Sequence, residues 1–242
     1  MKKTIISAAL LFTVATLLVS SCKKDDAKPQ AYVCTTCTTT PDALAVNDAS
    51  GKGVYKGVLI GSTGTIKFSV QNGTNDITAT MVIDNTTVVL TSAVNWVDGQ
   101  PYVAPFTGTM NGQPVSITFS VQPNGGSPII TSTNIPGHPN ADFTLVKETS
   151  NALIECFEGT YSTTAPETGT FNILLSRTLG KWGGIAREDN STDEDDINGD
   201  IVNGVLKDDN GNTVGTLSGD EINGSFQDGN GSTVTVTGER TL

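Results

Sequence analysis

Apolar and polar residues alternate along most of the chain beyond residue 53. In one such run, Ile66, Phe68 and Val70 alternate with Lys67 and Ser69. A period of two sends successive side chains to opposite faces of a β-strand, so each run predicts a strand with one buried face. The apolar positions of five further runs are Ile77, Ala79, Met81 and Ile83; Val115, Ile117, Phe119 and Val121; Phe143 and Leu145; Phe171, Ile173 and Leu175; and Val234 and Val236.

Turn signals separate these runs and favour antiparallel pairing. Asparagine and aspartate followed by glycine readily adopt the positive φ angles that tight hairpin turns require. The chain holds 26 glycines and is rich in Thr, Val and Ile, a composition typical of many short strands. We therefore expect an all-β fold in which the strands follow one another as a meander. The turn pairs are Asn72-Gly73, Asp98-Gly99, Asn111-Gly112, Asn210-Gly211 and Asp228-Gly229.

An internal repeat divides the β region into two similar halves. Tyr55 and Tyr161 correspond at an offset of 106 residues, and three other segments match at offsets of 105 to 107. This predicts two tandem antiparallel meander or barrel-like units, at residues 53–147 and 157–242, joined by a linker at 148–156. The other matches are Gly64-Thr65-Ile66 with Gly169-Thr170-Phe171, Gly108-Thr109-Met110-Asn111-Gly112 with Gly215-Thr216-Leu217-Ser218-Gly219, and Val115 and Phe119 with Ile222 and Phe226.

The first residues have the pattern of a secretory signal. Lys2 and Lys3 begin it, an apolar stretch follows, and small residues precede Cys22. The apolar stretch falls short of the roughly 20 residues that a spanning helix needs. We expect a signal peptide over residues 1–21, and then a polar tether over residues 22–52 with a short helical turn near Thr40-Pro41-Asp42.

The segment Val19-Ser20-Ser21-Cys22 resembles the lipobox of bacterial lipoproteins. The charged segment Lys23-Lys24-Asp25-Asp26 is similar to the export signal of Bacteroidetes-type surface lipoproteins. The resemblance implies that Cys22 carries lipid and holds the protein to the outer membrane, on the cell surface or on the periplasmic face. Glycine-punctuated β repeats behind a lipobox also resemble the barrel domains of outer-membrane surface lipoproteins, distantly including the transferrin-binding type.

The charge of the chain argues against nucleic acid as a partner. Without Lys2 and Lys3, 12 Lys and Arg stand against 25 Asp and Glu, a formal charge of −13. An acidic surface repels phosphate backbones. The expected partners are the membrane, through the lipid anchor, and an unknown protein, glycan or small ligand.

Three cysteines remain once Cys22 is assigned to the anchor. Cys34 can pair with Cys37, or one of the two can pair with Cys156, and in either case one thiol is left over. The Cys-x-x-Cys spacing also occurs in redox proteins, but here it lacks their βαβ context. A zinc site formed by these cysteines and His138 is chemically admissible, although a histidine on a surface loop is the simpler interpretation.

The acidic run from residue 188 to residue 200 offers oxygen ligands for Ca²⁺. The candidate ligands are Asp193, Asp195, Asp196 and Asp200, and the alternative is a solvated, self-repelling loop. No cofactor other than the lipid is expected.

No hydrolase motif is present, since the chain lacks Gly-x-Ser-x-Gly and His-Glu-x-x-His and has a single histidine. The first hypothesis is therefore a non-catalytic, lipid-anchored envelope protein with a binding or structural role. One alternative is a surface glycan-active enzyme or accessory, with carboxylates and aromatic rings facing a sugar. Another is a carrier that holds a small apolar ligand inside a barrel. The aromatic candidates are Trp96, Trp182, Tyr55 and Tyr161, of which the two tyrosines are expected to share a packing role.

Overall fold

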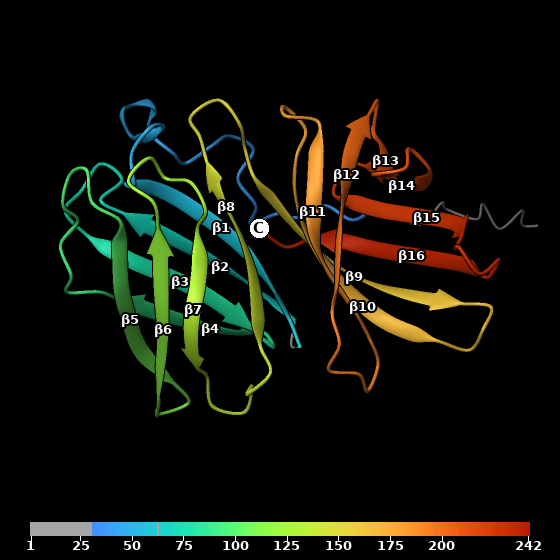
Figure 1. Ribbon diagram of the computed structural model, residues 1–242, viewed down its shortest axis with the longest axis horizontal. Helices are drawn as coiled ribbons and strands as arrows, with labels where there is room; N and C mark the ends of the chain where they lie inside the picture. Colours follow the sequence, from blue (N-terminus) through green and yellow to red (C-terminus); the bar gives the residue numbers. More distant parts are fainter. Residues whose placement is uncertain (1–30, 62) are drawn as a thin grey trace, which may run out of the picture. The chain divides into compact units, whose positions relative to one another are not determined.

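The computed structural model describes residues 31–61 and 63–242 and confirms an all-β fold. The signal peptide and Cys22 lie outside the described residues. Figure 1 shows the strands as two successive groups, the first coloured blue to yellow and the second yellow to red. In this part of the chain the only helix is η1, a single 3-10 turn at Ala45–Asn47, a few residues beyond the turn predicted near Pro41.

The first eight strands form one antiparallel sheet. Its order is β7-β6-β5-β4-β3-β2-β1-β8. The last strand, β8, pairs with the first, β1, so β7 and β8 are the two edge strands and the sheet does not close between them. The strands are β1 (Gly53–Ile60), β2 (Gly64–Val70), β3 (Ile77–Ile83), β4 (Thr86–Thr91), β5 (Tyr102–Met110), β6 (Gln113–Val121), β7 (Ile129–Asn134) and β8 (Asp142–Glu148).

The last eight strands form a closed antiparallel barrel. Its order runs from β10 through β16 to β9, and β16 closes the barrel against β9 by pairing Val236 with Tyr161. The strands are β9 (Glu155–Thr163), β10 (Thr168–Ser176), β11 (Lys181–Glu188), β12 (Asp195–Val202), β13 (Val205–Asp208), β14 (Thr213–Ser218), β15 (Glu221–Gln227) and β16 (Thr233–Arg240).

Two-residue turns set the register of several hairpins. Asn111 and Gly112, with φ of 51° and 78°, join β5 to β6 so that Met110 pairs with Gln113. Asn203 and Gly204 do the same between β12 and β13. Left-handed backbone at both central residues matches the right-handed twist of the flanking strands.

The sequence repeat maps onto the structure with a shift of one strand. Its first matches place β1 and β2 on β9 and β10, whereas the later match places the β5–β6 hairpin on β14–β15. The second unit therefore has one more strand, β13, before that hairpin. After that hairpin the first unit continues with two strands, β7 and β8, where the second unit has β16, which pairs with β9 as β8 pairs with β1. The two units reach eight strands in different ways.

Aromatic side chains fill the interior of the first unit. The rings of Phe68 and Phe119 stack at 4.5 Å, and Phe106 meets Phe68 edge-on at 4.9 Å. Tyr55 packs 5.1 Å from Phe119 and donates its hydroxyl hydrogen to the carbonyl of Gly51. These four side chains are fully buried, so this interior is a packed core.

A buried ion pair lies where the first unit packs against the second. Lys56 on β1 binds Glu148 on β8 at 2.7 Å, and both side chains are wholly inaccessible to solvent. Lys56 also donates to the carbonyl of Ile154, and Glu148 accepts from the backbone N–H groups of Ile154 and Asp42. The pair is thus satisfied by backbone groups on both sides, as a buried charge requires.

An apolar cluster surrounds this pair, formed by Val58, Ile154, Cys156 and Leu174 with Val146 and Leu242 against it. It covers the outer face of β1, which is why all eight residues of that strand are buried although they alternate in direction.

Residues 32–42 are held against the two units instead of forming a free tether. Tyr32 donates from its backbone to Glu221 and from its hydroxyl to the carbonyl of Arg240. The backbone N–H of Cys34 donates to Asp220, and Arg240 donates to the carbonyl of Thr38. These contacts pack this segment, predicted to belong to the tether, against one end of the second barrel.

Candidate functional site

A cavity of about 520 Å³ occupies the interior of the second barrel. An eight-stranded barrel is just wide enough either to be filled by its own side chains or to hold one small ligand. Side chains fill the interior of the first unit, whereas the interior of the second unit has room for a ligand. The apolar wall of the cavity includes Phe171, Trp182, Ile197, Leu206, Ile222 and Val236.

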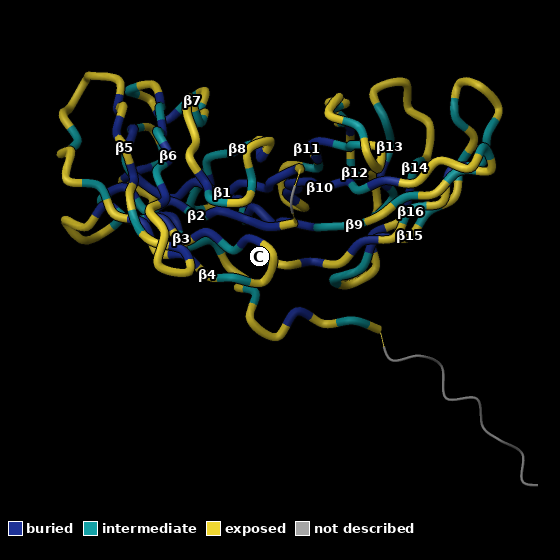
Figure 2. The backbone as a smooth tube through the Cα atoms, turned by 90° about the horizontal axis from the view of Figure 1, so that it is seen from below, coloured by how far each residue is buried: buried dark blue, intermediate teal, exposed yellow. Residues whose placement is uncertain are grey.

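Smaller inward side chains account for the space. Phe68 of the first unit corresponds to Ile173 in the second when the repeat is followed along β2 and β10. Phe119, fully buried in the aromatic core, corresponds to Phe226, which is only half-buried and borders the cavity. Several apolar wall residues likewise remain partly accessible, among them Ile197, Val214 and Val236. Figure 2 shows the same difference, with more intermediate and exposed residues along β12–β16.

Glycines allow the larger rings to lie flat along the barrel wall. A Cβ at Gly159 would stand 2.3 Å from Cζ of Phe171, and a Cβ at Gly169 would stand 2.5 Å from the ring of Tyr161. Each ring therefore crosses a neighbouring strand at a position without a side chain. This arrangement moves the rings toward the wall and leaves the centre open.

The two ends of the barrel differ. One end is closed by the buried Arg240, which pairs with Glu155 at 3.0 Å and Asp220 at 3.6 Å, and by residues 32–38 packed over it. The other end carries the loops at 164–167, 189–194, 209–212 and 228–232. Cavity residues lie at this loop end, so it forms the mouth.

Carboxylates gather at the mouth. The acidic residues lining the cavity are Glu167, Asp195, Asp196, Asp208, Asp209 and Asp228. Burial, and after it the charge of neighbouring carboxylates, raises the pKa of Tyr161, whose ring lines the same cavity. Those carboxylates belong to Glu188, Asp195, Glu167 and Asp189.

Trp182 lies deep in the cavity, near the start of β11 and away from the mouth. Its side chain is largely buried in the core of the second unit, and its indole nitrogen donates to the carbonyl of Lys207 at 3.0 Å. The hydrogen bond fixes the ring, so that its face can contact an apolar ligand without leaving a polar atom unsatisfied.

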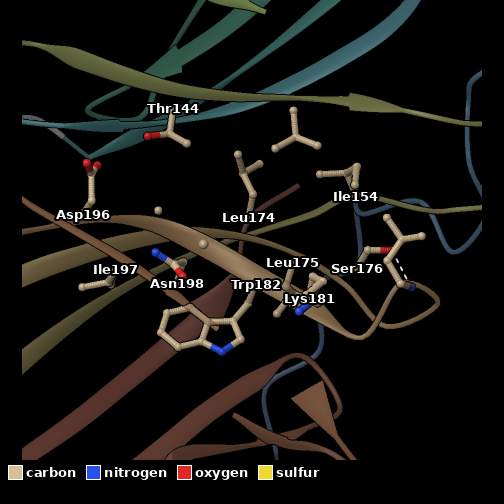
Figure 3. Close-up of a pocket in the computed structure, with 14 residues that line it drawn as sticks. Thr144, Ile154, Leu174, Leu175, Ser176, Lys181, Trp182, Asp196, Ile197 and Asn198 are labelled. Carbon is tan, nitrogen blue, oxygen red and sulfur yellow. Dashed lines mark hydrogen bonds between the residues drawn. The ribbon is translucent and has the colours of Figure 1, made fainter. Parts of the chain in front are cut away.

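A second hollow, of about 400 Å³, lies outside the barrel between β8 and strands β10–β12. Figure 3 shows Thr144 of β8 and Leu174 of β10 on its two sides, with Trp182 turned to the opposite side of the strand. Val146 and Ile154 complete an apolar floor that continues the cluster around Lys56. This groove belongs to the packing between the two units.

The structure resolves the pairing of the cysteines. Cys34 and Cys37 form a disulfide with a Cα–Cα distance of 5.4 Å, and Cys156 is a free, buried thiol. Burial raises the pKa of the Cys156 thiol to about 12. The zinc site considered from sequence is therefore wrong, because two of its sulfurs are bonded to each other. His138 sits in a turn, with Nδ1 3.8 Å from a carboxylate oxygen of Asp84.

The acidic residues proposed for Ca²⁺ do not come together. In residues 31–61 and 63–242 no group of three or more potential ligands is placed to hold a metal ion. Asp195 and Asp200 lie on one extended strand, where five residues span about 16 Å. Asp200 is paired with Lys181, whereas Asp195 and Asp196 border the barrel cavity.

The aromatic candidates separate into two groups. Trp182 and Tyr161 line the cavity, whereas Tyr55 is fully buried in the first core and Trp96 packs against that core. Tyr55 packs in the first core, and Tyr161 packs across Gly169 with its ring beside the cavity, so a shared packing role stays a prediction. The remaining cavity residues were missed because their alternation predicts a buried face without indicating whether that face is filled.

No family model, curated protein or solved structure matches this chain. Across residues 31–61 and 63–242 there is no helix long and apolar enough to cross a membrane.

Proposed function

We propose that the protein is a non-catalytic, lipid-anchored protein of the outer membrane that holds a small, largely apolar ligand inside its second barrel. The observation that carries this proposal is the cavity of about 520 Å³ in a barrel whose neighbour, built on a related repeat, is filled with aromatic rings. Small-molecule sites in proteins usually measure roughly 300–1,000 Å³ and have mainly apolar walls. The lipid on Cys22 would keep this binding unit at the membrane surface.

A glycan-active enzyme is the runner-up and stays a prediction. The carboxylates at the mouth could serve as an acid and a base in such an enzyme. The wall below them is apolar, however, and favours a ligand whose apolar surface is buried on binding.

A neutral fluorescent probe tests the binding proposal. N-phenyl-1-naphthylamine brightens when it enters an apolar site, so titration of the purified protein reports occupancy. Val236→Phe places a larger side chain in the cavity, and Thr235→Phe, one residue earlier on β16, places the same side chain on the exposed outer face. The added ring would take up cavity volume that the probe has to occupy. We expect Val236→Phe to weaken binding about fivefold or more while Thr235→Phe leaves it unchanged.

Two results would overturn the proposal. One is no saturable binding by the unaltered protein. The other is an equal loss in both variants, because that would place the probe on the outer surface.

A further inference from the structure

The charge at the mouth of the cavity bears on the chemistry of the ligand. We infer that the ligand is a cationic amphiphile, with an apolar body in the barrel and a positively charged group, such as an ammonium, at the mouth. This inference rests on the proposed function and narrows it to one class of ligand.

The acidity of the chain is concentrated in the second barrel. Residues 155–242 contain 16 Asp and Glu against five Lys and Arg, a formal charge of −11. Without Lys2 and Lys3 the remainder of the sequence holds nine acidic and seven basic side chains, a formal charge of −2. Most of the net negative charge therefore lies on the barrel that holds the cavity, where it favours a cation over an anion.

Some of the carboxylates at the mouth are already engaged by the protein. Asp208 accepts the backbone N–H groups of Asn210 and Asn212, and Asp228 accepts those of Asn230 and Ser232. These two aspartates stabilise their own turns.

Asp209 also has a partner. With the amide of Asn198 oriented to donate, its nitrogen lies 2.7 Å from Oδ1 of Asp209. This contact joins β12 to the β13–β14 turn.

Two other carboxylates line the same cavity without such partners. Within the part of the chain that the structure describes, Glu167 and Asp195 have no side-chain hydrogen bond or ion pair, whereas the carboxylate of Asp196 lies in the outer groove beside Thr144 (Figure 3). Arg187 is paired with Glu194, and Lys207, whose ammonium donates to the neutral carbonyl of Gly211, offsets at most one of the carboxylates at the mouth. A positive group at the mouth would therefore meet an excess of negative charge.

The positions of the charged and apolar residues along the cavity predict how the ligand is oriented. Glu167 and Asp195 lie at the start of β10 and β12, which is the mouth end, whereas Trp182 lies near the opposite end. Polar groups above an apolar wall match a molecule with a charged head and an apolar tail. Opposite charges a few ångströms apart attract, and more strongly near a protein surface than in bulk water. A head group facing Glu167 and Asp195 should therefore gain about tenfold in affinity.

A matched series with one apolar tail and three head groups tests this inference. Isothermal titration calorimetry of the purified protein would compare octylammonium, 1-octanol and octanoate, each below its aggregation concentration. We expect octylammonium to bind about tenfold more tightly than 1-octanol, and octanoate to bind more weakly than either. The preference should shrink in about 1 M salt, where screening reduces the Debye length to about 3 Å.

Charge variants locate the effect. Glu167→Gln with Asp195→Asn should reduce the preference for octylammonium over 1-octanol to about twofold. Asp76→Asn with Asp98→Asn removes the same charge from exposed loops of the first unit and should alter neither affinity.

The outcomes separate the two claims. Equal binding of all three compounds, or tightest binding of octanoate, would overturn the inference and leave an apolar site in place. No binding of any of the three would overturn the proposed function and the inference with it.

Discussion

Substitution of Lys56 by methionine should be among the most damaging single changes in the described part of the chain. The change removes the 2.7 Å contact to Glu148 and the hydrogen bond to the carbonyl of Ile154, and it leaves a carboxylate that is completely buried. Loss of one partner of a buried ion pair typically costs about 3–5 kcal/mol. Domains are usually stable by only about 5–15 kcal/mol, so the loss is a large fraction of the total.

The assay is equilibrium unfolding in denaturant, followed by circular dichroism, with the melting temperature as a second measure. For a chain of this size about 1 kcal/mol corresponds to about 2–4 °C, so Lys56→Met should lower the melting temperature by about 6–20 °C. Adding Glu148→Gln should restore part of the loss. A neutral amide no longer requires a cation, and its single oxygen can still accept one of the two backbone N–H groups, from Asp42 or from Ile154.

The exposed pair of Lys181 and Asp200 provides the control, and Lys181→Met should leave the transition unchanged. A cost of less than about 1 kcal/mol for Lys56→Met would show that the buried pair is not a main source of stability. A double variant no more stable than the single one would show that the unpaired buried charge is not the source of the loss.

Two further predictions concern glycine packing and pH. Gly159→Ala places a Cβ 2.3 Å from the ring of Phe171 and should destabilise the fold by about 1–3 kcal/mol in chemical denaturation, whereas Gly229→Ala, with nothing within 4 Å, should be neutral. Because burial raises the pKa of the Cys156 thiol from 9.0 to about 12, the unfolded state releases this proton first, and stability should fall as the pH rises from about 9 to 12. Cys156→Ala should make that fall shallower in unfolding curves measured across this range, and an unchanged slope would contradict the assignment.

Period-two patterning predicted several of the strands, among them β2, β3, β6 and β10, and the internal repeat predicted their grouping into two units. Ile66, Phe68 and Val70 all turn inward on β2, and Asn111-Gly112 forms the predicted hairpin turn. These features depend on neighbouring residues along the chain, which is the information that alternation and turn chemistry contain.

Lys56 shows where such patterning fails. As a charged residue between Tyr55 and Gly57 it has the appearance of a solvent-facing position, yet it is completely buried. The outer face of β1, on which Lys56 lies, is covered by residues about 90 to 100 positions later in the chain. Only the three-dimensional arrangement therefore reveals Ile154 and Glu148 as the partners of Lys56.

The cavity could not be predicted for a similar reason. Alternation marks Ile173, Ile222 and Val236 as inward-facing, just as it marks the aromatic residues of the first unit. Whether inward side chains meet across a barrel depends on the strand number and tilt, together with the summed volume of all inward positions. The one available signal was the replacement of Phe68 by the smaller Ile173 between the repeats, and its meaning depends on knowing that both units contain eight strands.

Methyl-resolved NMR of the protein during titration with 1-octanol shows which barrel receives the ligand. We expect saturable shifts of the Val214, Ile222 and Val236 methyl signals, which belong to the cavity of the second barrel. The methyl signals of Val115 and Ile117, in the packed core of the first unit, should stay unchanged. Shifts confined to the first unit, or no saturable shifts in the second, would show that the second barrel does not bind the ligand.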